Sequence, residues 1–417
     1  MENYEKDLAV LIGVDFEEEN DAERSLDELE RLAETAGVET ALKSIQRRKA
    51  PSPATYIGRG KAEEIAELCK QQDVNIVIVD DELKGSQIRE LEDIFDMRVI
   101  DRTTLILDIF ASRATSLEGS LQVELAQLIY RLLRLTGIGT ELSRLGGGIG
   151  TRGPGETKLE SDRRHIRRRI LSIQQQLDEI AKRRELSRKK RAKDGAVTVA
   201  LVGYTNAGKS SLMNALCENA GVYVQDQLFA TLDPTIRRLE TDGEDVLLVD
   251  TVGFIRKLPH TLVNAFSSTL EESLCASLLL IVVDSSDSEA QDQLEIVSKL
   301  LYDLGASDKP ALLVLNKCDI AGDLTEETAI LSYQYKVPVL SVSAVTGEGL
   351  EELKKTIIDI VFPAKVYDLV FPYSEGGALA LLHDKSIILN TEHMADGTHI
   401  KARINNEDVP KFERFFI

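Results

Sequence analysis

The stretch "GYTNAGKS", residues 203–210, decides the fold. It fits the phosphate-loop pattern G-x-x-x-x-G-K-[ST] in full, it follows the apolar run "AVTVALV", and it opens a helical segment. In that setting backbone N–H groups hold phosphate oxygens, Lys209 reaches the β and γ phosphates, and the Ser210 hydroxyl binds Mg²⁺. The sequence therefore predicts a nucleoside triphosphate site at the end of a buried strand. The predicted loop residues are Gly203, Tyr204, Thr205, Asn206, Ala207, Gly208, Lys209 and Ser210.

A second motif, "DTVG", follows the apolar run "DVLLV" downstream of this loop. An aspartate at the end of such a strand can hold Mg²⁺ through water, and the backbone N–H of the glycine can contact the γ-phosphate. Without the phosphate loop, a capping aspartate at a strand end would be the better interpretation. The predicted residues are Asp250, Thr251, Val252 and Gly253.

The base specificity is predicted by "NKCD", which follows the apolar run "ALLVL". The Asp319 carboxylate can accept from both the ring N–H and the exocyclic amine of guanine, a pair of donors that adenine lacks. Backbone N–H groups after the next strand can contact the guanine O6. Because these motifs all follow strands, they meet at the carboxyl edge of a doubly wound sheet and predict GTP as the substrate. The predicted residues are Asn316, Lys317, Asp319, Ser343, Ala344 and Val345.

Three residues bear on hydrolysis itself. We expect Thr231 in "LFATLDPT" to complete the Mg²⁺ shell with Ser210, and Thr235 is the second choice. Phe254 stands where signalling GTPases have a water-orienting glutamine, so intrinsic hydrolysis should be slow and should depend on a partner. Asn206 could hold a monovalent cation such as K⁺ beside the phosphates, although asparagine also suits a tight turn. The predicted catalytic residues are Lys209, Thr231, Gly253 and Asn206, and the predicted nucleotide contacts of the switch are Leu228, Phe229, Ala230, Thr231 and Leu232.

Composition bounds the class of protein. A chain of 417 residues has room for about three domains. The four cysteines form no C-x-x-C pair, and no histidine stands at metal-ligand spacing, which favours a reducing compartment. The first residues lack a basic segment followed by an apolar one, and no apolar run is long enough to span a bilayer. We therefore expect a cytoplasmic protein that is not inserted into a membrane and is a monomer.

The predicted fold class is α/β, with a small parallel α/β unit, an antiparallel coiled-coil arm of two helices, a doubly wound phosphate-loop sheet and a small α+β tail. Strand and helix patterns alternate in residues 1–101 and again in 194–364. Between them, apolar residues recur at heptad spacing from Thr104 to Leu135 and from Ile166 to Ile180. We therefore assign 102–193 to the arm, 136–157 to its glycine-rich tip loop, and 365–417 to the tail.

The arm is a basic segment in an acidic chain. The formal net charge is -20, which taken alone argues against a nucleic-acid partner, but residues 144–193 hold 16 Lys or Arg and 6 Asp or Glu, a balance of +10. Its tip, "LGGGIGTRGPGETKLE", resembles a nucleotide loop but follows a helix, and it has Glu156 where lysine is needed. We interpret it as an RNA-contacting tip, the alternatives being a connector, a solvated face or a surface for a protein coiled coil. The candidate RNA contacts are Arg144, Arg152, Lys158, Arg163, Arg164, Arg167 and Arg168.

Four blocks together resemble the HflX family of GTPases: "GYTNAGKS", "QLFATLDPT", "DTVGFIRKLPHTLVNAFSSTLEE" and "GPGETKLESDRR". The likeness covers about residues 1–363, and Lys257 falls at a position where we expect variation to be tolerated. The resemblance implies a Mg²⁺-dependent GTPase that binds the large ribosomal subunit, is stimulated by it, and dissociates or rescues stalled ribosomes under stress. The alternatives are a GTPase of ribosome assembly or RNA modification, and a GTP-switched regulator that binds a protein.

Overall fold

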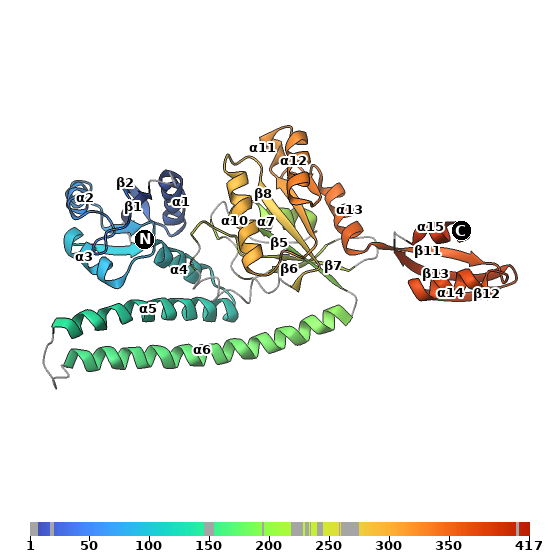
Figure 1. Cartoon of the computed structure of the whole chain (residues 1–417), viewed down its shortest axis with the longest axis horizontal. Helices are drawn as coiled ribbons and strands as arrows, with labels where there is room; N and C mark the ends of the chain where they lie inside the picture. Colours follow the sequence, from blue (N-terminus) through green and yellow to red (C-terminus); the bar gives the residue numbers. More distant parts are fainter. Residues whose placement is uncertain are drawn as a thin grey trace, which may run out of the picture. The chain divides into compact units, whose positions relative to one another are not determined.

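The computed structural model describes residues 7–16, 21–145, 154–193, 196–217, 228–229, 233, 235–239, 245–257, 259, 275–405 and 408–417. The chain divides into two units, Met1–Gly347 and Glu348–Ile417. The first unit contains a parallel sheet, a mostly parallel second sheet and the long helical arm, and Figure 1 labels their elements.

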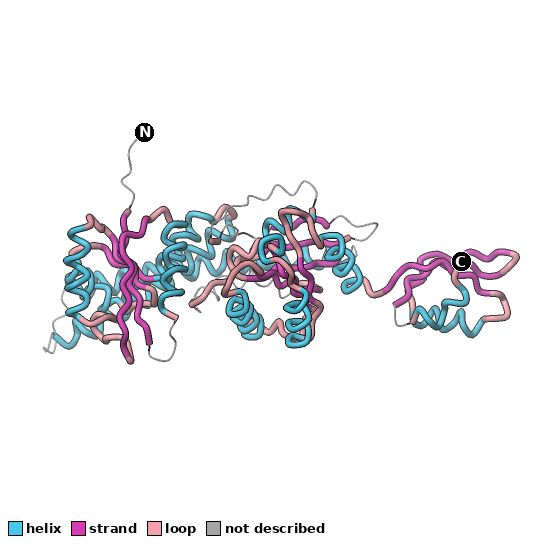
Figure 2. The backbone as a smooth tube through the Cα atoms, turned by 90° about the horizontal axis from the view of Figure 1, so that it is seen from above, coloured by secondary structure: helices cyan, strands magenta, loops and turns pink. Residues whose placement is uncertain are grey.

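Apolar runs build a parallel sheet near the N-terminus. Its strands pair in the order β2-β1-β3-β4. β1 is buried on both faces, as expected for a parallel strand covered by helices on either side. Figure 2 shows helices on both sides of this sheet. The strands are β1 (Leu8–Phe16), β2 (Glu39–Arg48), β3 (Ile76–Val79) and β4 (Arg98–Asp101), and the helices between them are α1 (Ala22–Thr35), α2 (Arg59–Gln71) and α3 (Gly85–Phe95).

The segment 102–113 does not belong to the arm, contrary to our assignment. It forms a separate helix, α4 (Arg102–Arg113), whose Leu105, Ile106 and Phe110 are buried in one core with α1 and the first sheet. The Asp101 side chain accepts from the backbone N–H of Thr104 at 3.0 Å and so caps this helix. Heptad-like spacing describes a helix that covers a sheet as well as one that covers another helix. The spacing alone therefore does not distinguish a helix of the coiled-coil arm from a helix that covers a sheet.

The arm is an antiparallel pair of helices, α5 (Leu117–Leu145) and α6 (Pro154–Lys193), as predicted. Leu121, Leu125 and Ile173 are buried between them. The tip is shorter than the predicted loop of 136–157, because the backbone is helical up to Leu145 and again from Pro154. Glycine inside a helix costs about 1 kcal/mol, which a long helix can absorb, so the glycines at 137 and 139 did not end α5.

The second sheet has the strand order β10-β9-β8-β5-β7-β6. Its strands are parallel except β6, which pairs antiparallel with β7. The predicted apolar strands are all present, whereas β6, "TIRRL", was not predicted because two arginines separate its two apolar residues, so it shows neither an apolar run nor alternation. The strands are β5 (Val197–Gly203), β6 (Thr235–Leu239), β7 (Val246–Asp250), β8 (Leu278–Asp284), β9 (Ala311–Asn316) and β10 (Val339–Ser341). The helices are α7 (Lys209–Leu216), α10 (Ala290–Asp303), α11 (Cys318–Ala321) and α12 (Thr325–Tyr335).

The second unit contains a helix followed by the predicted α+β tail. Its antiparallel strands have the order β11-β13-β12, and Leu369, Ile400 and Phe412 lie in a core of their own. The strand β12, "IILNTEHM", was not predicted, and all but one of its residues are exposed. The elements are α13 (Leu350–Val361), β11 (Ala364–Phe371), α14 (Gly376–Lys385), β12 (Ile387–Met394), β13 (Gly397–Asn405), α15 (Val409–Phe412) and the 3-10 turn η1 (Glu413–Phe415).

Candidate nucleotide site

The phosphate loop connects β5 to α7, as the sequence predicts. Asn206 and Gly208 have φ angles of 62° and 87°, so the backbone between strand and helix passes through the left-handed region. A Cβ on Gly208 would overlap the Asn316 side-chain amide, which excludes any other residue there. The loop is therefore shaped by its own glycine and asparagine and by the side chain that ends β9.

Lys209 lies buried beneath this loop. Its ammonium donates to the Gly203 and Tyr204 carbonyl oxygens at 3.2 and 2.7 Å. Burial lowers the pKa of Lys209 to about 8, and the nearby Asp250 carboxylate acts in the opposite direction. A buried cation held by neutral carbonyls would be stabilised by an anion, because opposite charge favours the protonated form. This environment fits the β and γ phosphates of a nucleotide.

Ser210 and Asp250 form a second part of the site. The Ser210 hydroxyl donates to the Asp250 carboxylate at 2.5 Å, and Asp250 is fully buried at the end of β7. Hydroxyl and carboxylate oxygens are the ligands that Mg²⁺ prefers, so these two side chains fit that ion. The Thr251 hydroxyl is different, because it donates to the Leu201 carbonyl oxygen at 2.7 Å and so stabilises the sheet.

The segment that follows Asp250 runs back against the phosphate loop. A Cβ on Gly253 would lie 3.1 Å from the Lys209 ammonium, so the Gly253 backbone is close to where phosphate would bind. The Phe254 backbone exchanges hydrogen bonds with the loop: its N–H donates to the Gly203 carbonyl, and its carbonyl accepts from the Thr205 N–H. The Phe254 side chain is buried. It therefore fills the core at the position where a glutamine would meet water.

Asn316 connects the loops on either side of it. Its side-chain amide donates to the Ala207 carbonyl at 3.0 Å, and its Oδ1 accepts from the Ala344 N–H at 3.2 Å. Lys317 has a left-handed backbone, and its ammonium pairs with Asp284 at 2.5 Å. Asp319 lies in the first turn of α11 with its side chain exposed. One asparagine thus links the phosphate loop to the loop of Ser343 and Ala344.

The predicted switch residues are described only in part. Ala230, Thr231 and Leu232 lie outside the described residues, whereas Thr235 is the first residue of β6 and pairs with Asp250 in the sheet. Leu228 and Phe229 are buried in the cluster that also includes Leu29 of α1 and Phe110 of α4. The nucleotide contacts predicted for this segment stay a prediction.

The structure describes only some of the candidate RNA contacts. Arg152 lies outside the described residues, and of Arg144 and Lys158 only the helical backbone is described. The Arg163 guanidinium donates to the Leu135 carbonyl across the arm, so it holds the two helices together. The remaining three, Arg164, Arg167 and Arg168, are exposed on α6.

A network of charged residues was missed by the sequence analysis. The Tyr204 hydroxyl, from the phosphate loop, donates to Glu28 of α1 and accepts from the Arg256 backbone N–H. Arg102 is buried and pairs with both Glu28 and Asp80. Lys257, which we expected to tolerate variation, pairs with Asp80 at 2.7 Å. No local pattern could reveal these pairs, since their members lie far apart in the sequence.

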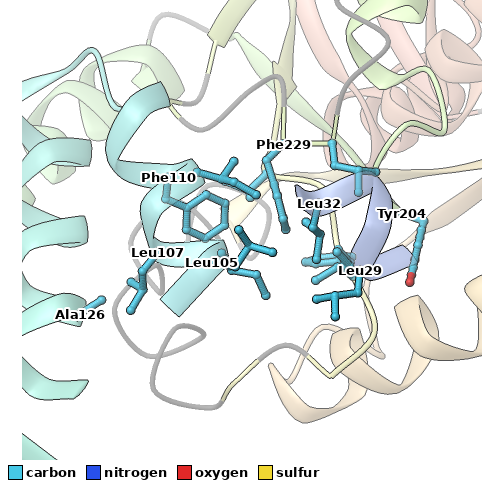
Figure 3. Packing of buried hydrophobic residues seen from close by; sticks show 14 of the residues in the cluster. Leu29, Leu32, Leu105, Leu107, Phe110, Ala126, Tyr204 and Phe229 are labelled. Carbon is cyan, nitrogen blue, oxygen red and sulfur yellow. The ribbon is translucent and has the colours of Figure 1, made fainter. Parts of the chain in front are cut away.

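Apolar residues join the two sheets in the same region. One buried cluster includes Leu29 of α1, Phe110 of α4, and Tyr204, Phe229 and Phe254 from beside the second sheet. Figure 3 shows Phe110 and Phe229 in contact, with Leu29 and Tyr204 nearby. The loops around the nucleotide site are therefore packed directly on the N-terminal sheet and its helices.

Comparisons with known proteins decide the family. The curated "GTPase HflX" of Caldanaerobacter subterraneus subsp. tengcongensis is 46% identical over 415 residues, which covers 99% of this chain and 94% of that protein. The chain belongs to the HflX family of GTPases. The "GTPase HflX" of Escherichia coli (strain K12) is 48% identical over 352 residues, covering 84% of this chain and 82% of its own.

Family models match three consecutive parts of this HflX chain. They are "GTP-binding GTPase N-terminal" at 23–111, "GTP-binding GTPase Middle Region" at 113–191 and "50S ribosome-binding GTPase" at 198–317. Among solved structures, "crystal structure of SsGBP and GDP complex" matches with a TM-score of 0.49 and 27% identity, covering 85% of this chain and 98% of that one. The curated relatives and the GTPase family model show that the chain binds GTP and hydrolyses it, as predicted. Within the described residues, no helix combines the length and apolar character needed to cross a membrane.

Proposed function

We propose that this HflX GTPase binds the large ribosomal subunit through its helical arm and couples GTP hydrolysis to dissociating or rescuing stalled ribosomes in the cytoplasm. The observation that carries the proposal is the exposed row of Arg164, Arg167 and Arg168 on a two-helix arm within an acidic chain. Arginine guanidinium groups pair with phosphate oxygens and stack on bases. The family model named "50S ribosome-binding GTPase" supports the same partner.

The packing of the arm supports this proposal, because it leaves these three arginines exposed to solvent. Ile166 and Ile173 are buried on the inner face of α6, whereas Arg164, Arg167 and Arg168 lie on the other faces. The neighbouring Arg169 pairs with Glu124 of α5 at 2.6 Å, and it therefore stabilises the arm instead. A rigid arm can bring a few arginines to RNA while the acidic domains remain farther from the phosphates.

In the proposed nucleotide site Lys209 binds the phosphates, Asp319 selects guanine, and Ser210 and Thr231 hold Mg²⁺. The ion, when bound, neutralises charge that develops on the phosphate oxygens. Because Phe254 is buried and pinned to the phosphate loop, its side chain cannot orient the attacking water. Intrinsic hydrolysis is therefore slow, and the ribosome supplies or positions the missing group, which can be worth about 10³ to 10⁵ in rate.

A role for K⁺ at Asn206 is part of the proposal and has its own test. The left-handed backbone of Asn206 gives a conformational reason for asparagine at this position. Ribosome-stimulated hydrolysis measured in K⁺ and in Na⁺ separates the two explanations. Faster turnover in K⁺ supports a cation ligand, and equal rates leave the turn as the reason for Asn206.

The experiment that tests the main proposal measures hydrolysis and ribosome dissociation together. GTP turnover is followed for the protein alone, with small subunits, with large subunits and with whole ribosomes, while sedimentation reports dissociation. We expect stimulation by large subunits and ribosomes. Stimulation without dissociation would favour a role in subunit assembly, and stimulation by none of them would end the proposal.

Charge reversal locates the RNA contact. The variant R164E/R167E/R168E should bind large subunits much more weakly, and the dependence of log affinity on log salt should flatten by roughly one unit per lost phosphate contact. The matched control, K182E/R183E/K190E, changes the net charge equally at three other exposed positions of α6. Equal affinity losses in both variants would assign the effect to net charge, and a flat salt profile in the unmodified protein would favour a protein partner.

A further inference from the structure

Thr205 stands in the phosphate loop, and its side chain lies against the segment that follows Asp250. Its backbone N–H donates to the Phe254 carbonyl at 2.8 Å. A Cβ on Gly253 would lie 2.8 Å from Cγ2 of Thr205 and 3.1 Å from the Lys209 ammonium. The Thr205 side chain and the ammonium that binds phosphate therefore both reach the same point beside the Gly253 backbone.

The Thr205 hydroxyl is a buried polar group without a partner. The residue is only 5% exposed, and in the part of the chain that the structure describes its Oγ1 makes no hydrogen bond. The hydroxyl of Thr251 differs, because it donates to the Leu201 carbonyl. A buried hydroxyl that makes no hydrogen bond lowers stability, and nearly all such groups in native proteins have a partner. The stability of the protein without nucleotide therefore does not explain this hydroxyl.

The shape of the loop does not require threonine at this position either. The residues of the loop that have a left-handed backbone are Asn206 and Gly208, so the conformation that favours asparagine or glycine falls on them. Valine has nearly the same shape as threonine, and it would fill the same space against Gly253 without an unpaired group. A ligand that accepts the hydroxyl hydrogen is the remaining explanation.

The γ-phosphate of GTP is an acceptor that fits this position. Its oxygens carry negative charge, which spreads over them during phosphoryl transfer. The Gly253 backbone, against which Thr205 packs, is the group that contacts this phosphate in the proposed site. Phe254 provides no polar side chain here, because its ring is buried in the core. The Thr205 hydroxyl approaches the same place from the phosphate loop.

We propose that the Thr205 hydroxyl donates a hydrogen bond to an oxygen of the γ-phosphate, which makes Thr205 a catalytic residue that also distinguishes GTP from GDP. The inference rests on the proposed nucleotide site, in which Lys209 binds the phosphates. It goes beyond that site because the phosphate-loop pattern accepts any residue at position 205. The hydrogen bond should become stronger in the transition state, as charge develops on the oxygen that accepts it.

The variant T205V tests this contact, because it removes the hydroxyl and keeps the shape of the side chain. Its affinity for a fluorescent, non-hydrolysable GTP analogue should fall about tenfold, and its affinity for the matching GDP analogue should change less than about twofold. The rate of hydrolysis in a single turnover should also fall about tenfold or more. T205S keeps the hydroxyl and should restore most of the GTP affinity and of the rate.

Thermal unfolding without nucleotide separates a ligand contact from a structural role. T205V should melt about 2 °C or more above the unmodified protein, because a methyl group replaces an unpaired hydroxyl. The matched control is T55V, since Thr55 is 4% exposed and its hydroxyl donates to the Ile57 carbonyl at 2.6 Å. T55V should melt lower and bind both nucleotides normally. A lower melting temperature in T205V would assign the hydroxyl to the fold and overturn the inference.

K209M distinguishes failure of this inference from failure of the proposed site. We expect K209M to lose affinity for GTP and GDP alike, whereas T205V loses affinity for GTP alone. If K209M behaves in this way and T205V binds and hydrolyses GTP normally, the site stands and the Thr205 contact is refuted. If K209M binds both nucleotides normally, the proposed site fails and the inference fails with it. Equal losses of GTP and GDP affinity in T205V would show a distorted loop and refute the γ-phosphate contact.

Discussion

Nucleotide affinity should fall as the pH rises from 7 to 8.5, because the phosphate-binding Lys209 is buried. Burial holds the pKa of Lys209 at about 8, below the ordinary value of 10.5. The folded protein without nucleotide therefore binds this proton more weakly than the unfolded chain does. Protonation of Lys209 opposes folding in full below about pH 8, and this opposition is lost progressively as the pH rises from about 8 to 10.5. Bound phosphate raises the pKa of Lys209, since it stabilises the protonated ammonium.

The size of the effect follows from the fraction of Lys209 that is protonated. With a pKa of about 8, roughly nine tenths of the side chain is charged at pH 7 and roughly one quarter at pH 8.5. If only the charged form binds phosphate, Kd for GTP or GDP rises about fourfold over this interval. At pH 8.5 each binding event takes up about three quarters of a proton.

Calorimetric titration with GDP in two buffers of different ionisation heat measures both quantities. The observed heat at pH 8.5 should differ between the buffers, and at pH 7 the difference should nearly vanish. K209R keeps its charge throughout this range, so any affinity that it retains should not follow the pH. A Kd that is constant from pH 7 to 8.5, with equal heats in both buffers, would refute the reasoning.

Two further predictions concern base selection and stability. D319N should lower GTP affinity by about 10⁴ and create affinity for xanthosine triphosphate, because the 2-oxo group of xanthine accepts from the new amide. Competition binding measures both affinities. Retained GTP preference would contradict the role of Asp319. R102M should lower the free energy of unfolding by about 3 to 5 kcal/mol, because it leaves Asp80 and Glu28 without their buried partner. Urea denaturation measures this loss. The neutral variant R102M/E28Q/D80N should recover most of the lost free energy of unfolding. A loss below about 1 kcal/mol in R102M would show that the network is not stabilising.

The nucleotide site could be predicted because its motifs are local. Each consists of an apolar strand followed by a few polar residues, and the rule that parallel strands present their carboxyl ends at one edge brings them together. The structure has this arrangement for Lys209, Ser210 and Asp250, whose atoms are in contact or close. What the motifs do not contain is the link provided by Asn316, whose two amide contacts reach loops on either side of it.

The partners of helices and charged side chains could not be predicted in the same way. The spacing of Leu107 and Ala111 is equally compatible with a coiled coil and with the sheet that α4 covers. Arg102 and Glu28 are separated by 74 positions, and each alone is an ordinary charged residue of a helix. Burial of such a pair is decided by tertiary packing, to which neither hydropathy nor spacing is sensitive.

These tertiary contacts have a common consequence for the GTPase cycle. The residues after Gly253 are held to the start of α1 and to the end of β3 through Arg256 and Lys257, which pair with Asp21 and Asp80. The segment before β6 is held to the base of the arm through Asp233. If a bound nucleotide moves either segment, these contacts must break, or the residues that they join must move together. Because coupling between two sites is reciprocal, a ribosome that displaces the arm would alter GTP affinity by the same factor by which GTP alters ribosome affinity. D233A should therefore reduce both effects together, and it should do so without removing any of the exposed arginines of α6.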